Sequence, residues 1–336
     1  MPMKIAVDAM GGDFAPTEVV QGALIAAQER ADLEVILVGD ENQVRATLDK
    51  LGGSPDRVTL RHAPQVIRMD EHPAQAVRRK RDSSLVVAGL MVRDGEADGT
   101  FSVGNTGAAM TIATLDIGRI QGVDRPAIAT TLPTLKGRTL LLDAGANVDC
   151  SVQNLVQFAL LGAIYAERVM GISNPSVGLL SIGSEEAKGN ELTKETYQRL
   201  KYAPINFFGN VEGKDVFEHA VDVVVCDGFA GNVLLKSAEG MGELIFDLLQ
   251  HEIDADPHIT SVLENFAPIF RRLMQRVHYS EFGGAPLLGV NGVSFIGHGR
   301  SNAKAVASGI QATALAAGSN YVQAIREALP TAEGRS

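Results

Sequence analysis

The chain has 336 residues and carries 30 Lys and Arg against 40 Asp and Glu, a formal net charge of −10. This charge gives no general attraction to DNA or RNA, and the absence of Trp argues against stacking platforms for single strands, so we expect no nucleic-acid partner. The two cysteines, Cys150 and Cys226, are too few for a disulfide framework and fit a reducing compartment. The longest apolar stretch, residues 155–166, is too short to span a bilayer.

Short apolar runs alternate with helical patterns along the chain. The runs expected to form strands are 4–7, 33–38, 58–60, 99–103, 127–132, 139–143, 177–182, 205–208 and 221–226. The expected helices are 16–29, 41–51, 84–94, 106–116, 151–170, 191–201 and 303–328. This alternation predicts an α/β fold, a mostly parallel sheet with helices on both faces, in a single domain over residues 1–330.

One segment, residues 233–279, contains no strand pattern and predicts a projecting amphipathic helical pair. Its apolar stripe includes Ile259, Phe266, Ile269 and Phe270, and its polar face carries Arg271, Arg272 and Arg276. We expect the stripe to dock on the membrane surface, with the arginines attracting anionic lipid or an acidic protein. Packing of the stripe against a dimer partner is the alternative.

Four apolar runs end in loops of Gly, Asn and Asp that precede a helical pattern: 8–13, 102–107, 143–147 and 227–232. Ligands of open α/β sheets bind beyond the strand carboxyl ends, where glycine permits close approach and helix N-termini attract anions. We therefore predict a site for a polar, anionic ligand. The candidate residues in these loops are Asp8, Gly11, Gly12, Asp13, Ser102, Gly104, Asn105, Thr106, Gly107, Asp143, Asn147, Asp227, Gly228 and Asn232. A tight turn with Asp13 as a helix cap is the alternative for the first loop.

The second of these loops is neither a Walker A loop nor a dinucleotide fingerprint, which argues against ATP and NAD. The cations that we expect to face a phosphate are Arg125, Lys188 and Lys236. Either lysine could instead be a solvated surface charge, and Lys188 could form a salt bridge with Glu185 or Glu186.

Asn210 and Glu212 follow a further strand pattern and join the candidate binding residues. His298 lies in a glycine turn and also joins the candidate binding residues, although a structural role is the favoured interpretation. No paired Cys or His-x-x-x-His pattern is present, so we expect no metal site. Both cysteines are expected to be inert core thiols rather than nucleophiles.

Taken together, these motifs resemble the bacterial phosphate acyltransferase family, the acyl-acyl carrier protein:phosphate transacylases of phospholipid synthesis. The matching segments are 8–13, 102–107, 125–127, 142–147, 188–190, 209–213, 227–232 and 283–289. Ser181 and Ser184 stand where the family usually has Asn and Glu, which puts a functional role for Glu185 in doubt. The resemblance implies a three-layer α/β/α Rossmann-like fold of the phosphate acetyltransferase and isopropylmalate dehydrogenase type.

The resemblance also implies an activity: transfer of a long-chain acyl group from acyl carrier protein to inorganic phosphate. The acyl phosphate would then supply a membrane glycerol-3-phosphate acyltransferase in phosphatidic acid synthesis. The family further implies a homodimer. From the composition and the apolar stripe we expect a cytoplasmic protein that associates peripherally with the inner face of the cell membrane. No cofactor is expected, because the partner protein carries the phosphopantetheine. Lys188, Asn105 and Asn232 are the expected catalytic residues, which would hold phosphate and stabilise the oxyanion.

Two other functions remain open at this point. A short-chain acyl-CoA:phosphate acyltransferase would use the same chemistry with a free CoA donor. A non-catalytic membrane scaffold would use the apolar stripe and have no use for the polar loops. A turnover assay with carrier-bound and CoA-bound acyl donors would separate the three.

Overall fold

The computed structural model describes residues 2–255, 269 and 283–329. Its strands are β1 (Met3–Asp8), β2 (Leu33–Gly39), β3 (Val58–His62), β4 (Gly99–Ser102), β5 (Ala127–Thr134), β6 (Gly137–Leu142), β7 (Ser176–Leu180), β8 (Asn206–Val211), β9 (Val223–Val225), β10 (Ala285–Leu288) and β11 (Val293–Ile296). They form a continuous 11-stranded sheet in the order β3-β2-β1-β4-β11-β10-β5-β6-β9-β7-β8.

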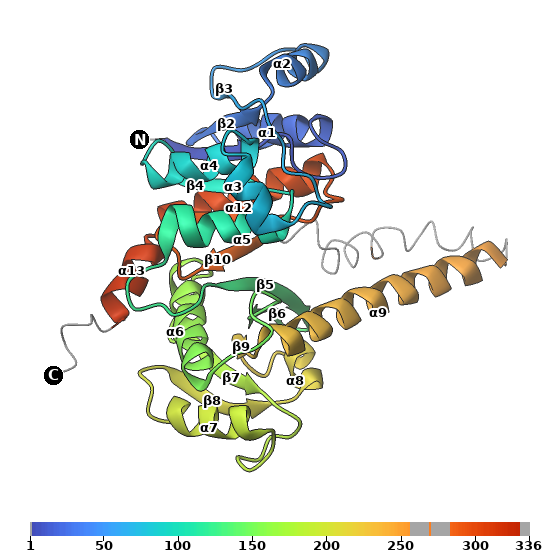
Figure 1. Ribbon diagram of the computed structural model, residues 1–336. Helices are drawn as coiled ribbons and strands as arrows, with labels where there is room; N and C mark the ends of the chain where they lie inside the picture. Colours follow the sequence, from blue (N-terminus) through green and yellow to red (C-terminus); the bar gives the residue numbers. More distant parts are fainter. Residues whose placement is uncertain (1, 256–268, 270–282, 330–336) are drawn as a thin grey trace.

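The sheet is parallel except around its centre, where β10 pairs antiparallel with both β11 and β5, and β5 pairs antiparallel with β6. These reversals divide the molecule into an upper half, built on β1 to β4 and β11, and a lower half, built on β6 to β9 (Figure 1). Each half keeps its strands parallel, so the loops after β1 and β4 gather in the upper half, and those after β6 and β9 gather in the lower half.

The described helices are α1 (Thr17–Glu29), α2 (Glu41–Lys50), α3 (Pro73–Arg79), α4 (Ser84–Arg93), α5 (Thr106–Ile112) continued by η1 (Ala113–Gly118), α6 (Val152–Arg168), α7 (Glu191–Leu200), α8 (Gly213–Glu218), α9 (Gly228–Ala255), α12 (Ala303–Gly318) and α13 (Tyr321–Ala328). In the upper half α1 and α12 pack together against one group of strands, while α4 packs with α5 and η1. In the lower half α6 covers β6, β7 and β9. Helices therefore flank the sheet, which confirms the predicted α/β class.

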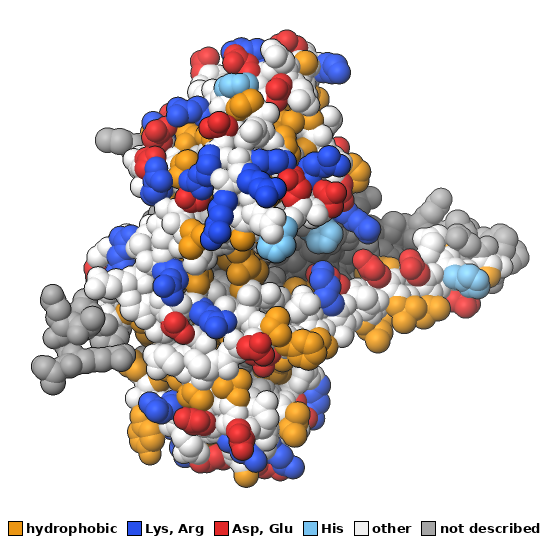
Figure 2. Space-filling model, in the orientation of Figure 1, with side chains coloured by type: hydrophobic (Ala, Val, Ile, Leu, Met, Phe, Trp, Pro, Cys, Tyr) orange, Lys and Arg blue, Asp and Glu red, His pale blue; other side chains and the backbone are white. Residues whose placement is uncertain are grey.

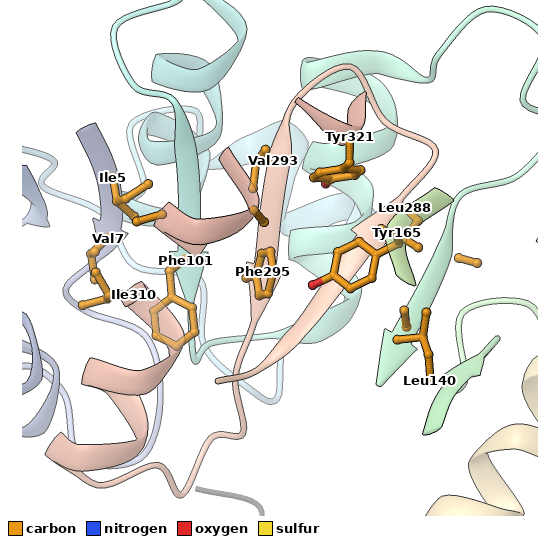
Figure 3. Close-up of a cluster of buried hydrophobic side chains, with 14 of the residues drawn as sticks. Ile5, Val7, Phe101, Leu140, Tyr165, Leu288, Val293, Phe295, Ile310 and Tyr321 are labelled. Carbon is orange, nitrogen blue, oxygen red and sulfur yellow. The ribbon is translucent and has the colours of Figure 1, made fainter. Parts of the chain in front are cut away.

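A hydrophobic core runs through both halves and fixes the sheet beneath the loops (Figure 3). Ile5, Phe101 and Ile310 fill the upper part, and Leu140 lies in the lower part. The two parts are continuous in the middle. There the rings of Tyr165 and Tyr321 meet edge to face, with centroids 5.5 Å apart. Aromatic pairs of this geometry add about 0.5–1.5 kcal/mol to the free energy of burial.

Four short elements were not predicted from the sequence: α3, α8, β10 and β11. Each is at most seven residues long, and β10 contains Pro286 and lies between Gly284 and Gly289, so its pattern is typical of a loop. The predicted helix 303–328 is also two helices, because Asn320 adopts a left-handed conformation with φ of 58° between α12 and α13. A hydrophobic pattern continues across such a break, so periodicity alone does not reveal it.

Helix α9 projects away from the sheet, as predicted for the first half of the helical pair (Figure 1). The second half of that pair, residues 256–279, lies outside the described residues except for Ile269, which is exposed. Among the helices that are described, none is long and apolar enough to cross a membrane.

Candidate functional site

The loops after β1 and β4 interlock through a buried carboxylate. Ser102 Oγ donates a hydrogen bond to Asp8 Oδ2 at 2.8 Å and accepts one from the Gly104 N–H at 3.0 Å. A Cβ built on Gly11 would lie 2.6 Å from Asp8 Oδ2 and 2.9 Å from the Gly104 nitrogen, so only glycine permits this approach. Burial raises the pKa of Asp8, against the opposing effect of hydrogen bonds from Ser84 and Ser102. Asp8, Gly11, Ser102 and Gly104 therefore form a scaffold.

Asn105 joins this scaffold to a neighbouring loop. Its Oδ1 accepts the Ala108 N–H at 3.0 Å and caps α5, because the first amides of a helix lack partners within it. Its Nδ2 donates to the carbonyl oxygens of Arg68, Met69 and Glu71, at 3.2–3.3 Å. The whole side chain is thus engaged with the protein. This gives Asn105 a positioning role, while direct contact with substrate stays a prediction.

The start of α5 offers unpartnered amides. Among the described residues, the N–H groups of Thr106 and Gly107 have no hydrogen-bond partner, and Thr106 is exposed. Amides at a helix N-terminus carry partial positive charge and bind phosphate or carboxylate groups well. Nearby, the N–H of Asp13 donates to the Gly299 carbonyl at 2.9 Å, which brings the turn containing His298 and the loop containing Gly12 beside this helix start. The upper half therefore supplies an anion site on the backbone.

In the lower half, Asp143 organises the loop after β6. Its carboxylate is fully buried and accepts the N–H groups of Ile128, Gly145, Ala146 and Asn147 as well as the Asn147 side-chain amide, at 2.6–3.2 Å. Burial raises the pKa of Asp143, and these donors oppose that shift. Because its oxygens are occupied by the protein, Asp143 shapes the loop, and so does Asn147, whose Nδ2 also donates to the Pro126 carbonyl.

The loop after β9 rests on the Asp143 loop and begins α9. The Gly228 N–H donates to the Asn147 carbonyl at 2.7 Å, and Asp227 Oδ1 accepts the Ala230 N–H at 2.8 Å. Gly231 lies directly against the Asp143 carbonyl oxygen, where no side chain fits. Asn232 follows on the first turns of α9, where it is exposed and its side chain makes no hydrogen bond to a described residue. Its amide is therefore available to a ligand.

The predicted cations differ in what they contact. Lys236 pairs with Glu239 at 2.6 Å, and Arg125 donates to the Asp149 carbonyl at 3.3 Å. Lys188 is exposed and makes no ion pair with a described residue, because Glu186 pairs instead with Lys201 at 3.0 Å. Of the three predicted cations, Lys188 is thus the one whose ammonium group contacts no partner among the described residues.

Residues at the end of β8 support the Lys188 loop and the helix that follows the strand. Asn210 is buried and its Nδ2 donates to the Glu185 carbonyl at 2.9 Å. Glu212 forms a capping box with Asp215 at the start of α8. Asn210 and Glu212 thus act on the loop and the following helix, and their contact with a ligand stays a prediction.

The two cysteines lie close to the Asp143 loop but are poor nucleophiles. Burial raises the pKa of Cys150 to about 11 and that of the fully buried Cys226 well above its ordinary value. A thiol with such a pKa is almost entirely protonated at neutral pH, and the thiolate is the reactive form. The surroundings of both residues therefore disfavour a covalent acyl-enzyme. Among the described residues, no cluster of His, Cys, Asp and Glu has the arrangement of a metal site.

Figure 2 shows a hollow between the upper half and α9, with two histidine side chains on its upper rim and Lys and Arg side chains gathered above it. The helix starts described above, those of α5 and α9, belong to the two halves that border this hollow. The geometry suits an anionic ligand held between backbone amides of one half and side chains of the other.

Comparison with known proteins identifies the family. A family model described as "Fatty acid synthesis protein" matches residues 3–324. A protein named Phosphate acyltransferase from Desulfitobacterium hafniense is 51% identical over 329 residues, covering 98% of each chain. This chain belongs to that family. The resemblance found in the sequence motifs is therefore confirmed over nearly the whole chain.

Solved structures of the same fold support the architecture. The EutD phosphotransacetylase from Staphylococcus aureus matches with a TM-score of 0.63 at 16% identity, covering 94% of both chains. A putative 4-hydroxythreonine-4-phosphate dehydrogenase from Salmonella typhimurium matches with a TM-score of 0.53 at 12% identity, over 94% of this chain and 99% of that one. These likenesses confirm the predicted relation to phosphotransacetylase and dehydrogenase folds.

One part of the site was not predicted from the sequence: the segment from Arg68 to α3 that Asn105 holds. The signal for it was present but weak. His72-Pro73 places proline at the first helical position, where its missing N–H costs nothing, but the helix that follows ends at Arg79. Its apolar face is too short to show a period.

Proposed function

We propose that this enzyme transfers a long-chain acyl group from the thioester of an acyl carrier protein to inorganic phosphate, giving acyl phosphate and free carrier protein. The observation that carries the proposal is the 51% identity to a phosphate acyltransferase over 98% of the chain. The site is consistent with it, because its unoccupied groups are suited to an anion and do not resemble a nucleotide site. The amides of Thr106 and Gly107 lie in one half and the side chain of Asn232 lies in the other, and none of them has a hydrogen-bond partner among the described residues.

The reaction does not require a nucleophilic side chain, because phosphate itself attacks the thioester. A phosphate oxygen attacks the thioester carbonyl, a C–O bond forms, and the C–S bond breaks as the thiolate leaves with its electron pair and takes a proton from solvent. The phosphate is already an anion, so the protein has to hold it and stabilise the oxyanion that develops. In this proposal the Thr106 and Gly107 amides bind phosphate. Asn232 donates to the oxyanion and Lys188 supplies positive charge.

The remaining polar residues hold the loops in the conformation that places these ligand-binding groups. Asp8, Asn105 and Asp143 each hold loop backbone rather than offering free donors. Loss of one oxyanion donor typically costs about 3–4 kcal/mol in the barrier. We therefore expect the largest selective losses of turnover at Lys188 and Asn232, and mixed losses of turnover and stability at the three holding residues.

A donor comparison tests the proposal. Palmitoyl-carrier protein, palmitoyl-CoA and acetyl-CoA are each incubated with the enzyme and phosphate, and acyl phosphate is trapped with hydroxylamine. We expect phosphate-dependent product with the highest kcat/KM for the carrier-bound donor. Preference for acetyl-CoA would favour the short-chain acyl-CoA alternative, and failure to turn over any donor would favour the non-catalytic scaffold.

We also propose that the enzyme is a homodimer that associates peripherally with the cytoplasmic membrane, where the acyl phosphate passes to a glycerol-3-phosphate acyltransferase. Support comes from α9, which exposes several large apolar side chains along its length (Figure 2). They are Phe229, Val233, Met241, Leu244, Ile245 and Leu248, each at least 49% exposed. We expect an exposed apolar face of this length to be buried against another surface, either lipid or a second copy of the chain. The arginines expected to assist, 271, 272 and 276, lie outside the described residues.

Variants of α9 distinguish membrane binding from dimer formation. Leu244→Glu and Leu248→Glu place charge on the exposed face without touching the loops of the site. Sedimentation velocity reports the dimer, and co-sedimentation with phosphatidylglycerol vesicles reports lipid binding. Loss of lipid binding with the dimer intact assigns the face to the membrane, and loss of the dimer assigns it to the partner copy. Wild-type levels of both would contradict the proposal.

A further inference from the structure

A basic surface lies beside the anion loops in a chain that is otherwise acidic. The segment 61–81, which ends with α3, contains six Arg and Lys residues against the two acids Asp70 and Glu71, whereas the whole chain has a net charge of −10. In Figure 2 Lys and Arg side chains gather on the face where Figure 1 places α3, above the hollow. We call this segment's exposed face the α3 basic surface.

Part of this positive charge is neutralised within the protein and part is free. Four of the six cations form ion pairs: Lys80 with Glu71 at 2.6 Å, Arg81 with Asp116 at 2.8 Å, Arg61 with Glu96 at 3.5 Å and Arg68 with Asp70 at 3.6 Å. Arg78 and Arg79 are exposed and make no ion pair or hydrogen bond with any described residue. Within the described part of the chain, the α3 basic surface thus presents two guanidinium groups without an ion-pair partner, side by side in sequence.

The α3 basic surface is attached directly to the candidate site. Asn105 Nδ2 binds the carbonyl oxygens of the loop that leads into α3, and a Cβ built on Gly107 would lie 2.6 Å from Pro73 Cγ. The first residues of α3 therefore pack on the start of α5, where the free amides lie. A partner bound at Arg78 and Arg79 is held within one short helix of the groups proposed to bind phosphate.

We propose that the α3 basic surface is the docking site for the acidic protein that carries the acyl thioester. This proposal rests on the proposed function and names where its protein substrate binds. Electrostatic complementarity favours this partner, because a net charge of −10 repels an acidic protein elsewhere on the chain while a local basic patch attracts it. Docking beside the loops also places the end of a flexible thioester arm near the phosphate.

The test assays two double variants, one on α3 and one on α7, each with two acyl donors. Arg78→Glu with Arg79→Glu reverses the charge of the α3 basic surface, and Lys194→Glu with Arg199→Glu makes the same change on α7, at the far end of the molecule (Figure 1). Each enzyme is assayed with palmitoyl-carrier protein and with palmitoyl-pantetheine, which has the same thioester without the protein. We expect the α3 variant to lose about tenfold or more in kcat/KM for the carrier-bound donor, mainly through KM. Activity with palmitoyl-pantetheine should stay within twofold of wild type, roughly the spread of surface substitutions.

Further readouts make the result decisive. The wild-type KM for the carrier-bound donor should rise with salt, and that dependence should flatten in the α3 variant. The milder pair Arg78→Gln with Arg79→Gln, which removes charge without reversing it, should give a smaller loss in the same direction, even if the Glu pair does not fold. Equal losses with both donors, an equal loss in the α7 control, or a loss confined to binding of phosphatidylglycerol vesicles would overturn the docking proposal. If the wild-type enzyme uses palmitoyl-pantetheine and ignores the carrier protein, the proposed function fails instead, and the docking site with it.

Discussion

Replacing Asn105 by Ala tests whether this residue positions the site or acts directly on the substrate. The substitution removes the cap on the Ala108 N–H, which typically costs about 1 kcal/mol. It also removes two amide protons shared among the carbonyls of Arg68, Met69 and Glu71. A net hydrogen bond contributes about 1 kcal/mol, and water can replace part of it because these bonds are only partly buried. We therefore expect the free energy of unfolding to fall by about 2–3 kcal/mol.

The measurement is urea unfolding at a fixed protein concentration, because the stability of the proposed dimer would depend on concentration. Asp40→Ala is the matched control: it removes a cap on α2, where Asp40 accepts the Gln43 N–H at 2.9 Å, and should cost about 1 kcal/mol. Asn105→Asp keeps the acceptor for Ala108 but loses the donors to the three carbonyls. It should therefore remain less stable than the wild type.

Turnover distinguishes the two roles of Asn105. A positioning residue should lose stability and turnover together, whereas an oxyanion donor should lose about 3–4 kcal/mol of transition-state stabilisation with stability unchanged. If Asn105→Ala costs no more stability than Asp40→Ala, the argument that its amide holds the 68–71 loop is refuted.

The remaining predictions concern the cation, the thiols and one glycine. Lys188→Ala should lower kcat by orders of magnitude with an unchanged thermal midpoint, because its exposed ammonium group makes no ion pair with a described residue; near-normal turnover would refute a catalytic role. The double variant Cys150→Ser, Cys226→Ala should keep substantial activity, and an acyl group trapped on either thiol during turnover would contradict this. Since the raised pKa of Cys150, about 11, keeps it a thiol at lower pH, its alkylation by iodoacetamide should be slow at pH 7 and accelerate toward pH 11; fast alkylation at pH 7 would disprove the shift. Gly231→Ala should destabilise the fold by about 1–3 kcal/mol or more, because the added methyl group would clash with the Asp143 carbonyl oxygen. An unchanged urea midpoint would show that the loops move to accommodate the methyl group and would contradict this prediction.

The sequence predicted the long elements well, because buried parallel strands and amphipathic helices each produce a clear hydrophobic period. β1 and α6, for example, lie where their patterns place them. The short strands β10 and β11 were missed although they join the two halves of the sheet, because four residues bounded by glycine show no period. Long-range pairing, which a local pattern does not contain, decides such elements.

The polar loops were located from the sequence, but the roles within them were not separated. Asp143 and Asn232 look alike in the sequence as polar residues of glycine-containing loops. The first is fully buried in backbone hydrogen bonds, whereas the second is exposed and its side chain has no hydrogen bond to a described residue. Which oxygen or amide is already satisfied depends on contacts between loops that are distant in the chain. The hydrogen bonds of Asn105 to residues 34 to 37 positions earlier are the clearest case.

The most direct test of the account follows the phosphate oxygens. The enzyme is incubated with palmitoyl-carrier protein and phosphate labelled with ¹⁸O at every position, and the product is analysed by mass spectrometry. Transfer of the acyl group to a phosphate oxygen predicts palmitoyl phosphate that retains every labelled oxygen, formed at a rate that depends on phosphate concentration. Unlabelled palmitate formed without phosphate dependence, or no product from the carrier-bound donor, would contradict the account.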